Sequence, residues 1–180
     1  MQTVHDLNWL NALSPESTRA ELLKCCGSTR WADTLTARRP FATLDQLLAQ
    51  ATEVWWALDQ TDWLEAFRSH PKIGEKKAAA PTAAVAADVA TQSQQWSAEE
   101  QQGVARAGEE AVEKLARLNR AYEEKFGFIF IVCATGKSTD EILALLETRI
   151  KNDPATELRS AAGEQAKITE LRLRKLLETA

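Results

Sequence analysis

Hydrophobic positions along the chain recur with a helical period. In the stretches 44–55, 104–122 and 158–177, apolar side chains return every three or four residues, and the alternation typical of strands is nearly absent. Seven glycines and five prolines are too few to divide 180 residues into many short strands. The pattern predicts an all-α fold: a single domain over residues 1–180, built as a bundle of about eight to ten helices without internal repeats.

Local start signals predict where several helices begin. We expect N-caps at four Ser and Thr residues, namely Thr3, Ser14, Thr43 and Ser138. A further helix should begin at Thr61 or Asp62 and run to His70. One or two helical turns are expected over 31–37, and the last helix should follow Pro154 and continue to Leu177.

The segment Ser97-x-x-Glu100 matches a capping box. It predicts the start of the longest helix, which would run to about Lys125 although two glycines weaken its first half. A functional interpretation is compatible with the cap. In it, Glu100 and Gln101 face a cleft, and the helix N-terminus offers donors to an anion.

Two stretches depart from the helical pattern. Residues 76–91 contain eight alanines and little bulk, so we expect a lid or surface connection there and not a core element. Residues 126–134 are dense in aromatic and β-branched side chains. One strand cannot make a sheet, so this run should be an extended buried connection or the end of a helix. Its backbone amides must then find partners among side chains, water or a ligand.

Composition and charge exclude several classes of protein. An apolar fraction of 44% with six tryptophans is sufficient for a core and argues against disorder. The formal net charge is −4 and no segment is strongly basic, which argues against a nucleic-acid partner. No apolar run approaches the roughly 18 residues of a membrane helix. The first residues lack the layout of a signal peptide, so we expect a cytoplasmic protein.

Metal and phosphate sites are not expected. The three cysteines and two histidines lack metal-ligand spacing, which predicts buried, reduced thiols and no metal. Gly136-Lys137-Ser138 resembles the end of a phosphate-binding loop, but that motif needs a glycine where Ile131 stands. Lys137 and Ser138 are therefore interpreted as the start of a capped helix.

Two side chains are candidates for chemistry. His70 precedes Pro71, which disfavours a helical conformation for the residue before it, so the histidine should lie where a helix stops. Imidazole titrates near neutrality, although the residue could instead be bonded to a backbone carbonyl at a helix end. Arg172 falls on the apolar face of the last helix. It should either pair with a Glu or Asp inside the protein or bind a ligand.

Five segments occur together in an order that resembles one enzyme family. They are Phe67-x-x-His70-Pro71-x-Ile73-Gly74, Ser97-x-x-Glu100-Gln101-x-Gly103, Asn119-x-x-Tyr122-x-x-Lys125-Phe-Gly-Phe128, Phe130-Ile-Val-Cys-Ala134-Thr-Gly-Lys-Ser138 and Lys167-Ile-x-x-Leu-Arg172-Leu. This set is similar to the 2-oxo-4-hydroxy-4-carboxy-5-ureidoimidazoline (OHCU) decarboxylases of purine catabolism. The resemblance extends from Leu7 to Leu177, and the forms of two segments resemble the bacterial branch.

The resemblance implies an all-helical, homodimeric lyase that uses no cofactor. Its small-molecule substrate would be decarboxylated to (S)-allantoin, after urate oxidation and hydroxyisourate hydrolysis. His70 and Glu100 match the family's catalytic residues. Substrate-binding positions are matched by Pro71, Ser97, Gln101, Arg172 and the backbone of Phe130, Ile131, Val132, Cys133 and Ala134.

Mechanistic expectations follow from the chemistry of this substrate. His70 should handle a proton at the substrate hydroxyl, and Glu100 should orient or polarise the same region; which of them delivers the stereospecific proton stays open. A clamp on the departing carboxylate would stabilise the ground state more than the transition state. We therefore expect Arg172 to grip a carbonyl or ureido edge.

Two alternatives remain at this point. One is a related cofactor-free lyase or hydrolase that acts on another ureido compound. The other is a non-catalytic helical interaction module, in which His70, Glu100 and Arg172 need not converge on any cavity.

Overall fold

The computed structural model describes residues 5–74, 87–105 and 108–177, and within these ranges the chain is helical with no strand. This confirms the all-α prediction. Ten helices are present in the described residues: α1 (Leu7–Ala12), α2 (Pro15–Cys25), α3 (Thr29–Ala37), α4 (Leu44–Ala57), α5 (Gln60–Arg68), α6 (Ala87–Glu100), α7 (Gln102–Ala105), α8 (Glu109–Phe126), α9 (Thr139–Arg149) and α10 (Pro154–Leu177).

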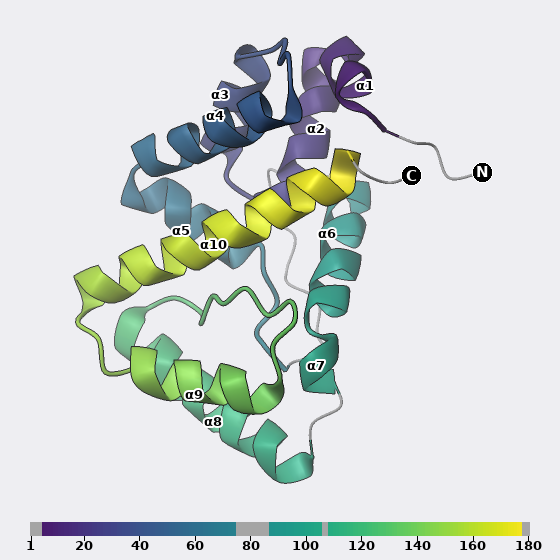
Figure 1. Cartoon of the computed structure of the whole chain (residues 1–180). Coiled ribbons are helices and arrows are strands. Elements are labelled where there is room, and N and C mark those ends of the chain that lie inside the picture. The colour runs from purple at the N-terminus through teal and green to yellow at the C-terminus, as the bar shows by residue number, and fades with distance from the viewer. Residues whose placement is uncertain (1–4, 75–86, 106–107, 178–180) are drawn as a thin grey trace.

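Helix α10 crosses the middle of the molecule (Figure 1). Helices α1 to α5 lie on one side of it, and the packed pair α8 and α9 lies on the other. Helix α10 packs against α2, α4 and α5, and α6 packs against α2. Because α10 borders both groups of helices, its buried residues can contact side chains from segments that are far apart in the sequence.

Two hydrophobic cores meet at the extended run after α8. The first core is formed mainly by α1 to α5 and α10, and the second by α8, α9 and Ile73. Ile131 and Cys133 belong to the first core, whereas Phe130, Val132 and Ala134 belong to the second. Successive side chains of an extended chain point to opposite sides. The run therefore connects the two cores, and the prediction of an extended buried connection is confirmed.

Three of the predicted caps are correct, and those at the first helix and at α5 are wrong. The side chains of Ser14, Thr43 and Ser138 accept backbone N–H bonds at the starts of α2, α4 and α9. Asp6 caps α1 in place of Thr3, which lies outside the described residues. Asp59 caps α5, so this helix begins earlier than the predicted Thr61 or Asp62. In both corrections an aspartate a few residues away satisfies the free amides.

The predicted capping box at Ser97 is also wrong. Ser97 lies inside α6 and is buried, and its hydroxyl donates to the Ser93 carbonyl at 3.0 Å. The predicted long helix is divided into the end of α6, α7 and α8, with Gly108 as the N-cap residue of α8. The tertiary partner of Ser97, described below, explains why a local sequence signal failed here.

The alanine-rich stretch is only partly covered by the structure. Residues 75–86 lie outside the described ranges, and α6 begins at Ala87, so the last part of the stretch is helical and not a surface connection. In the described part of the chain, no helix is long and apolar enough to cross a membrane. The same residues contain no group of three or more His, Cys, Asp or Glu that could hold a metal ion.

Candidate active site

A small, partly open cavity lies where the end of α5, the end of α6, the extended run and α10 meet, and together with the solvent at its mouth it encloses about 310 Å³. It lies beside the two cores, because Phe130 and Val132 come from the second core and Ile131 and Ile168 from the first. Eleven residues line it: His70, Pro71, Ile73, Ser97, Glu100, Gln101, Phe130, Ile131, Val132, Ala134 and Ile168. The described lining contains no lysine or arginine.

His70 reaches this cavity from just beyond α5, as its position before Pro71 predicted. Its backbone N–H donates to the Phe67 carbonyl at 3.2 Å, which closes the final turn. Among the described residues, its side chain is bonded to a side chain and not to a backbone carbonyl, which corrects that alternative. Nε2 of the ring lies 2.6 Å from Oε1 of Gln165, a residue of α10 with no exposed surface.

The surroundings of His70 keep its imidazole neutral. Burial lowers its pKa to about 3, and the positive charge of Arg172 acts in the same direction. The hydrogen bond with Gln165 acts in the opposite direction but is the smaller effect. At neutral pH the ring is therefore unprotonated, and its protonated form is a strong acid.

Glu100, at the end of α6, is held by Arg172 of α10. Nε of Arg172 donates to Oε1 of Glu100 at 2.8 Å, and Nη2 donates to Oε2 at 3.0 Å. This is the two-pronged geometry in which a guanidinium fixes both position and orientation of a carboxylate. The Glu100 side chain is 19% exposed, whereas that of Arg172 is 2% exposed. Glu100 therefore faces the cavity with Arg172 behind it.

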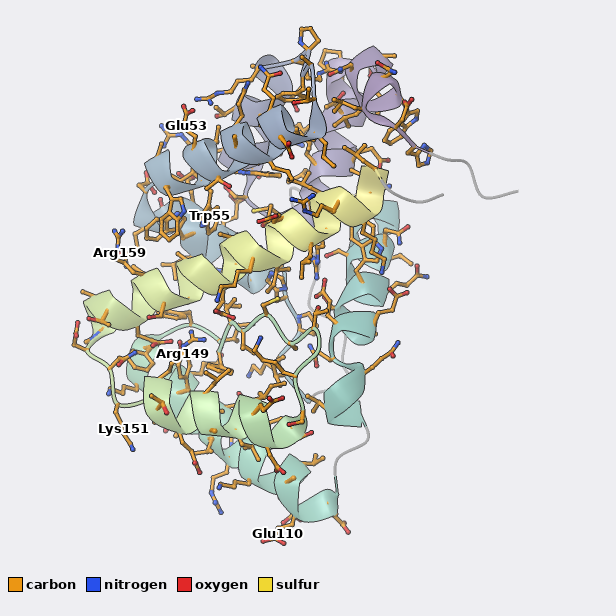
Figure 2. All side chains as sticks on the ribbon, in the orientation of Figure 1. Glu53, Trp55, Glu110, Arg149, Lys151 and Arg159 are labelled. Atoms are coloured by element: carbon orange, nitrogen blue, oxygen red, sulfur yellow. The ribbon has the colours of Figure 1, made fainter. Side chains whose placement is uncertain are left out.

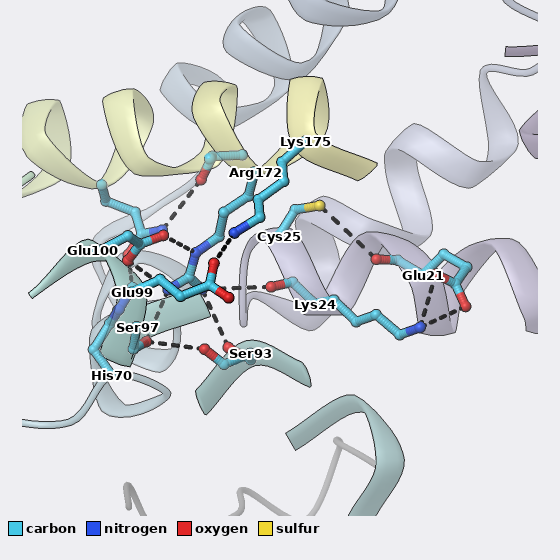
Figure 3. A network of polar contacts seen from close by, with 12 residues as sticks. Glu21, Lys24, Cys25, His70, Ser93, Ser97, Glu99, Glu100, Arg172 and Lys175 are labelled. Carbon is cyan, nitrogen blue, oxygen red and sulfur yellow. Dashed lines mark hydrogen bonds and ion pairs between the residues drawn. The ribbon is translucent and has the colours of Figure 1, made fainter. Parts of the chain in front are cut away.

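The remaining donors of Arg172 are also engaged by the protein (Figure 3). Nη2 donates to the Ser97 hydroxyl at 2.9 Å, and Nη1 donates to the Ser93 hydroxyl at 3.1 Å and to the Lys24 carbonyl at 3.4 Å. Of the two interpretations of Arg172, the structure shows the internal ion pair. Arg172 does not line the cavity, so its predicted contact with substrate stays a prediction that this geometry does not support.

A buried polar network holds the backbone of the extended run in place. Arg149 of α9, labelled in Figure 2, donates from Nη1 to the Ile131 carbonyl at 2.7 Å. Its Nη2 pairs with the carboxylate of Glu157 at 2.6 Å, and Tyr122 donates to the same carboxylate. Its guanidinium also lies 4.6 Å from the ring centroid of Phe130. The network stabilises the backbone that borders the cavity.

Cys133 differs from its neighbours in the run. Its backbone N–H, predicted to bind substrate, donates to Oε2 of Glu164 on α10 at 2.8 Å, and its side chain does not line the cavity. Burial raises the pKa of its thiol. The predicted roles of Phe130, Ile131, Val132 and Ala134 fit the cavity lining, whereas that of Cys133 does not.

The turn after His70 is held by the same neighbourhood. The Gln101 amide oxygen accepts from the Gly74 N–H at 3.2 Å, and Asn119 donates to the Ile73 carbonyl at 2.9 Å. Gly74 has a φ of 81°, and a Cβ there would lie 2.9 Å from a methyl group of Leu115. Gln101 therefore both lines the cavity and fixes the turn.

Sequence reasoning missed the polar residues that hold the site from α10. Gln165 lies two helical turns before Arg172, on the same face, and is fully buried. A polar residue in phase with the apolar face was the available signal, as it was for Arg172. Glu164 gave no such signal, since it lies at the margin of that face and its partner is a backbone amide.

The predicted residues therefore converge. His70, Pro71, Ser97, Glu100 and Gln101 line one cavity although they come from two separate segments, and Arg172 reaches the site through Glu100. This convergence counts against the interaction-module alternative.

Comparisons with known proteins identify similar chains. The sequence profile described as OHCU decarboxylase matches residues 11–174. The chain is 40% identical over 153 residues to the uric acid degradation bifunctional protein TTL of Arabidopsis thaliana, covering 84% of this chain and 45% of that protein. It is 30% identical over 142 residues to the 2-oxo-4-hydroxy-4-carboxy-5-ureidoimidazoline decarboxylase of Haloferax volcanii, covering 79% of this chain and 77% of that one.

A solved structure agrees with these relatives. A crystal structure of an OHCU decarboxylase in the presence of (S)-allantoin superimposes with a TM-score of 0.73 at 37% identity, covering 88% of this chain and 98% of that chain. The chain spans less than half the length of the Arabidopsis relative. The similarity to that longer protein therefore concerns only one part of it.

Proposed function

This chain belongs to the OHCU decarboxylase family, and we propose that it decarboxylates 2-oxo-4-hydroxy-4-carboxy-5-ureidoimidazoline to (S)-allantoin in urate degradation, without a cofactor. The observation that carries the proposal is that His70 and Glu100 line one small cavity, with Glu100 fixed by Arg172. Relatives named for this reaction and a structure obtained with (S)-allantoin support the same assignment.

The substrate's own chemistry explains why no cofactor is needed. Its name specifies a hydroxyl and a carboxyl group on C4 and a ureido group on the adjacent C5, which is joined to a ring nitrogen by a C=N bond. When the C4–carboxyl bond breaks, carbon dioxide leaves and the electron pair moves into the C=N bond through C4 and C5. The ring nitrogen takes up the negative charge and is protonated by a proton from solvent. The protein has to orient the scissile bond and direct proton transfers.

His70 is proposed as the group that moves the protons. A neutral imidazole accepts the C4 hydroxyl proton as the C4 carbonyl of allantoin forms. The resulting imidazolium is strongly acidic in this environment, because burial and Arg172 lower the pKa of His70 to about 3. It can return the proton to C5, and delivery to one face sets the (S) configuration. Glu100 would orient the substrate's donor groups.

The lining of the cavity suits loss of a carboxylate. A cation placed against the departing carboxylate would stabilise the ground state more than the transition state, because that charge moves into the ring. In the described lining no lysine or arginine is present, and Phe130, Ile131 and Val132 supply an apolar side. Arg172 has its donors engaged by Glu100, two serines and a carbonyl. We therefore propose that Arg172 acts through Glu100.

The test is the chirality of the product. Urate is converted with urate oxidase and hydroxyisourate hydrolase, and circular dichroism follows the allantoin formed with and without this protein. With the protein we expect rapid formation of (S)-allantoin, and without it slow formation of racemic allantoin. Racemic product at an unchanged rate would refute the proposed activity. Turnover of hydantoins in place of the urate-derived intermediate would favour the alternative, a related enzyme on another ureido compound.

Three further proposals rest on the family resemblance. We propose that residues 1–180 form one OHCU decarboxylase-like domain, that the protein is a homodimer, and that it acts in the cytoplasm. Size-exclusion chromatography with light scattering tests the oligomeric state, because a monomeric mass at micromolar concentration would exclude a stable dimer. Cell fractionation tests the location.

A further inference from the structure

Four polar side chains form a continuous chain through the first core and end at the cavity. Cys26 at the end of α2 contacts Thr169 of α10, Thr169 bonds to Gln165, and Gln165 bonds to His70. The two links nearest the cavity are 3.1 Å and 2.6 Å long. Thr169 is 5% exposed and Gln165 has no exposed surface, so neither can exchange its partner for water.

The direction of the hydrogen bonds follows from the atoms of Gln165 that face Thr169 and His70, and the far end of the chain agrees with it. Burial raises the pKa of Cys26 to about 12, and a hydrogen bond from Thr169 acts in the opposite direction. A hydrogen bond lowers the pKa of a thiol when it is donated to the sulfur, since it then stabilises the thiolate. The contact nearer the cavity fixes the direction: the Gln165 amide nitrogen lies 3.1 Å from the Thr169 hydroxyl, and an amide NH2 group can only donate. Toward Gln165, Thr169 therefore accepts, which agrees with a Thr169 proton directed to Cys26.

The orientation of the Gln165 amide follows from this. Its NH2 group donates to the Thr169 hydroxyl, so its carbonyl oxygen faces His70. A carbonyl oxygen can only accept, and the ring atom facing it is Nε2. Nε2 of His70 must therefore carry the proton, which leaves the lone pair of the neutral imidazole on Nδ1.

We propose that Gln165 is a positioning residue that selects the Nε2-protonated tautomer of His70 and so makes Nδ1 the nitrogen that exchanges protons with the substrate. This inference rests on the proposed decarboxylase function. A neutral imidazole has two tautomers, and only one presents a basic nitrogen in a given direction. Gln165 removes that ambiguity before the substrate binds.

An amide is the group that can do this without charging the ring. A carboxylate at position 165 would also accept from Nε2–H, but its negative charge would favour the imidazolium. Imidazolium cannot accept the hydroxyl proton of the substrate. Glutamine therefore fixes the ring in the way a carboxylate fixes the histidine of a hydrolytic triad, while leaving it neutral at rest.

The tautomer can be measured directly in the wild-type site. The chain has only two histidines, so a His5→Asn background leaves His70 as the single imidazole in a two-bond ¹⁵N–¹H correlation spectrum. At neutral pH we expect a protonated Nε2 and an unprotonated Nδ1. A protonated Nδ1 would overturn the inference, because the amide of Gln165 would then be turned the other way.

Variants test whether Gln165 causes the tautomer. In Gln165→Leu we expect a mixture of tautomers or a disordered ring, and a fall in kcat of about tenfold or more with little change in KM. Thr169→Val removes the hydroxyl that orients the amide, and Thr169→Ser keeps it while removing a methyl group. The valine variant should show a tautomer mixture and the serine variant the wild-type tautomer. A single Nε2-protonated species in both Gln165→Leu and Thr169→Val would overturn the inference.

The readouts separate this inference from the proposed function. If His70→Asn retains activity, the proposed role of His70 fails, whereas the tautomer spectrum still reports on Gln165. If His70→Asn is inactive but the spectrum shows Nδ1–H, only the inference fails. Glu170→Gln, an exposed change on the same helix, is the control for general effects of altering α10.

Discussion

Helix α10 holds the two candidate catalytic residues by two different arms. The neutral arm is Gln165 with His70, joined at 2.6 Å, and the charged arm is Arg172 with Glu100, joined by a two-pronged ion pair at 2.8 and 3.0 Å. The arms start two helical turns apart on one face of the same helix. One uses an amide to hold a base, and the other uses a guanidinium to hold a carboxylate.

The difference shows how one cavity can contain an uncharged base beside a carboxylate. An unpaired carboxylate near His70 would favour the imidazolium and remove the base. Arg172 compensates that charge at close range, and its own charge lowers the pKa of His70 further. The two arms are thus electrostatically coupled even though they share no hydrogen bond in the described contacts.

Removing the imidazole of His70 abolishes the neutral arm and should lower kcat more than any other change. His70→Asn keeps a polar side chain of similar size but cannot take up a proton near neutrality. We expect kcat to fall at least about a hundredfold, the usual scale for a general acid–base group. The measurement is initial-rate kinetics on the urate-derived substrate.

The matched control for this change is His5→Asn, which alters the other histidine. His5 stacks on Trp9 in the first part of the chain and does not line the cavity. Its substitution should leave kcat within about twofold of wild type. Retained activity in His70→Asn would remove His70 from the mechanism.

Lowering the pH should protonate His70 and thereby lower the free energy of unfolding. His70 has a folded pKa of about 3 and an ordinary value of 6.5, so the unfolded chain binds the proton more readily. The stability contributed by neutral His70 is complete above pH 6.5 and is lost as the pH falls toward 3. From pH 8 to pH 5 the loss is about 2 kcal/mol, roughly thirtyfold in the unfolding equilibrium.

The groups around His70 that bear on this prediction are Gln165, which does not titrate, and the ion pair of Arg172 with Glu100. Denaturant unfolding of wild type and His70→Asn at both pH values isolates the contribution of His70, since all other titratable groups are shared. The free energy of unfolding should fall by about 2 kcal/mol more in wild type. Equal pH dependence in the two proteins would show that His70 is not held neutral.

Arg172→Met breaks the charged arm. Glu100 loses both prongs of its ion pair, and Ser97 and Ser93 lose a shared donor. We expect kcat to fall roughly tenfold or more, because Glu100 is no longer fixed in position and orientation. Steady-state kinetics should show lower kcat in addition to any rise in KM.

Arg174→Met is the matched control, since Arg174 lies on the same helix but forms an exposed pair with Glu170. It should behave as wild type. A rise in KM alone in Arg172→Met would mean that Arg172 contributes binding that is equal in ground and transition states, and that fixing Glu100 does not assist the chemical step.

The neutral arm also marks the limit of what the sequence predicts. Periodicity, caps and turn residues predicted the all-α fold and most helix starts, because these signals are local. They misplaced Ser97, since its partner Arg172 comes from a helix far along the chain and no local pattern contains that contact. His70, Glu100 and Arg172 were identifiable from motifs, and the burial of Arg172 from helical phase.

The residues that position these groups were not identifiable in the same way. Gln165 was in phase with Arg172, but only the fold shows that it meets His70. Glu164 and Arg149 bind backbone atoms of the extended run. Because every residue type has these backbone atoms, the sequence does not indicate such a partner. The contacts that could not be predicted from the sequence are therefore those between side chains and backbone of distant segments.

The smallest expected effect comes from the end of the neutral arm that is farthest from the cavity. Cys26→Ala removes the sulfur that contacts Thr169, so the Thr169 hydroxyl can turn toward Gln165 and hold the amide less firmly in one orientation. We expect a detectable minor tautomer of His70 and a fall in kcat of about twofold to threefold, much less than for loss of the base itself.

Cys25→Ala deletes the same atoms from an equally buried neighbour, whose thiol instead contacts the Glu21 carbonyl at 3.9 Å. Each variant should lose stability through the cavity that it creates. Only Cys26→Ala should change the His70 spectrum, so equal spectra in both variants would show that the orientation of Gln165 does not depend on Cys26.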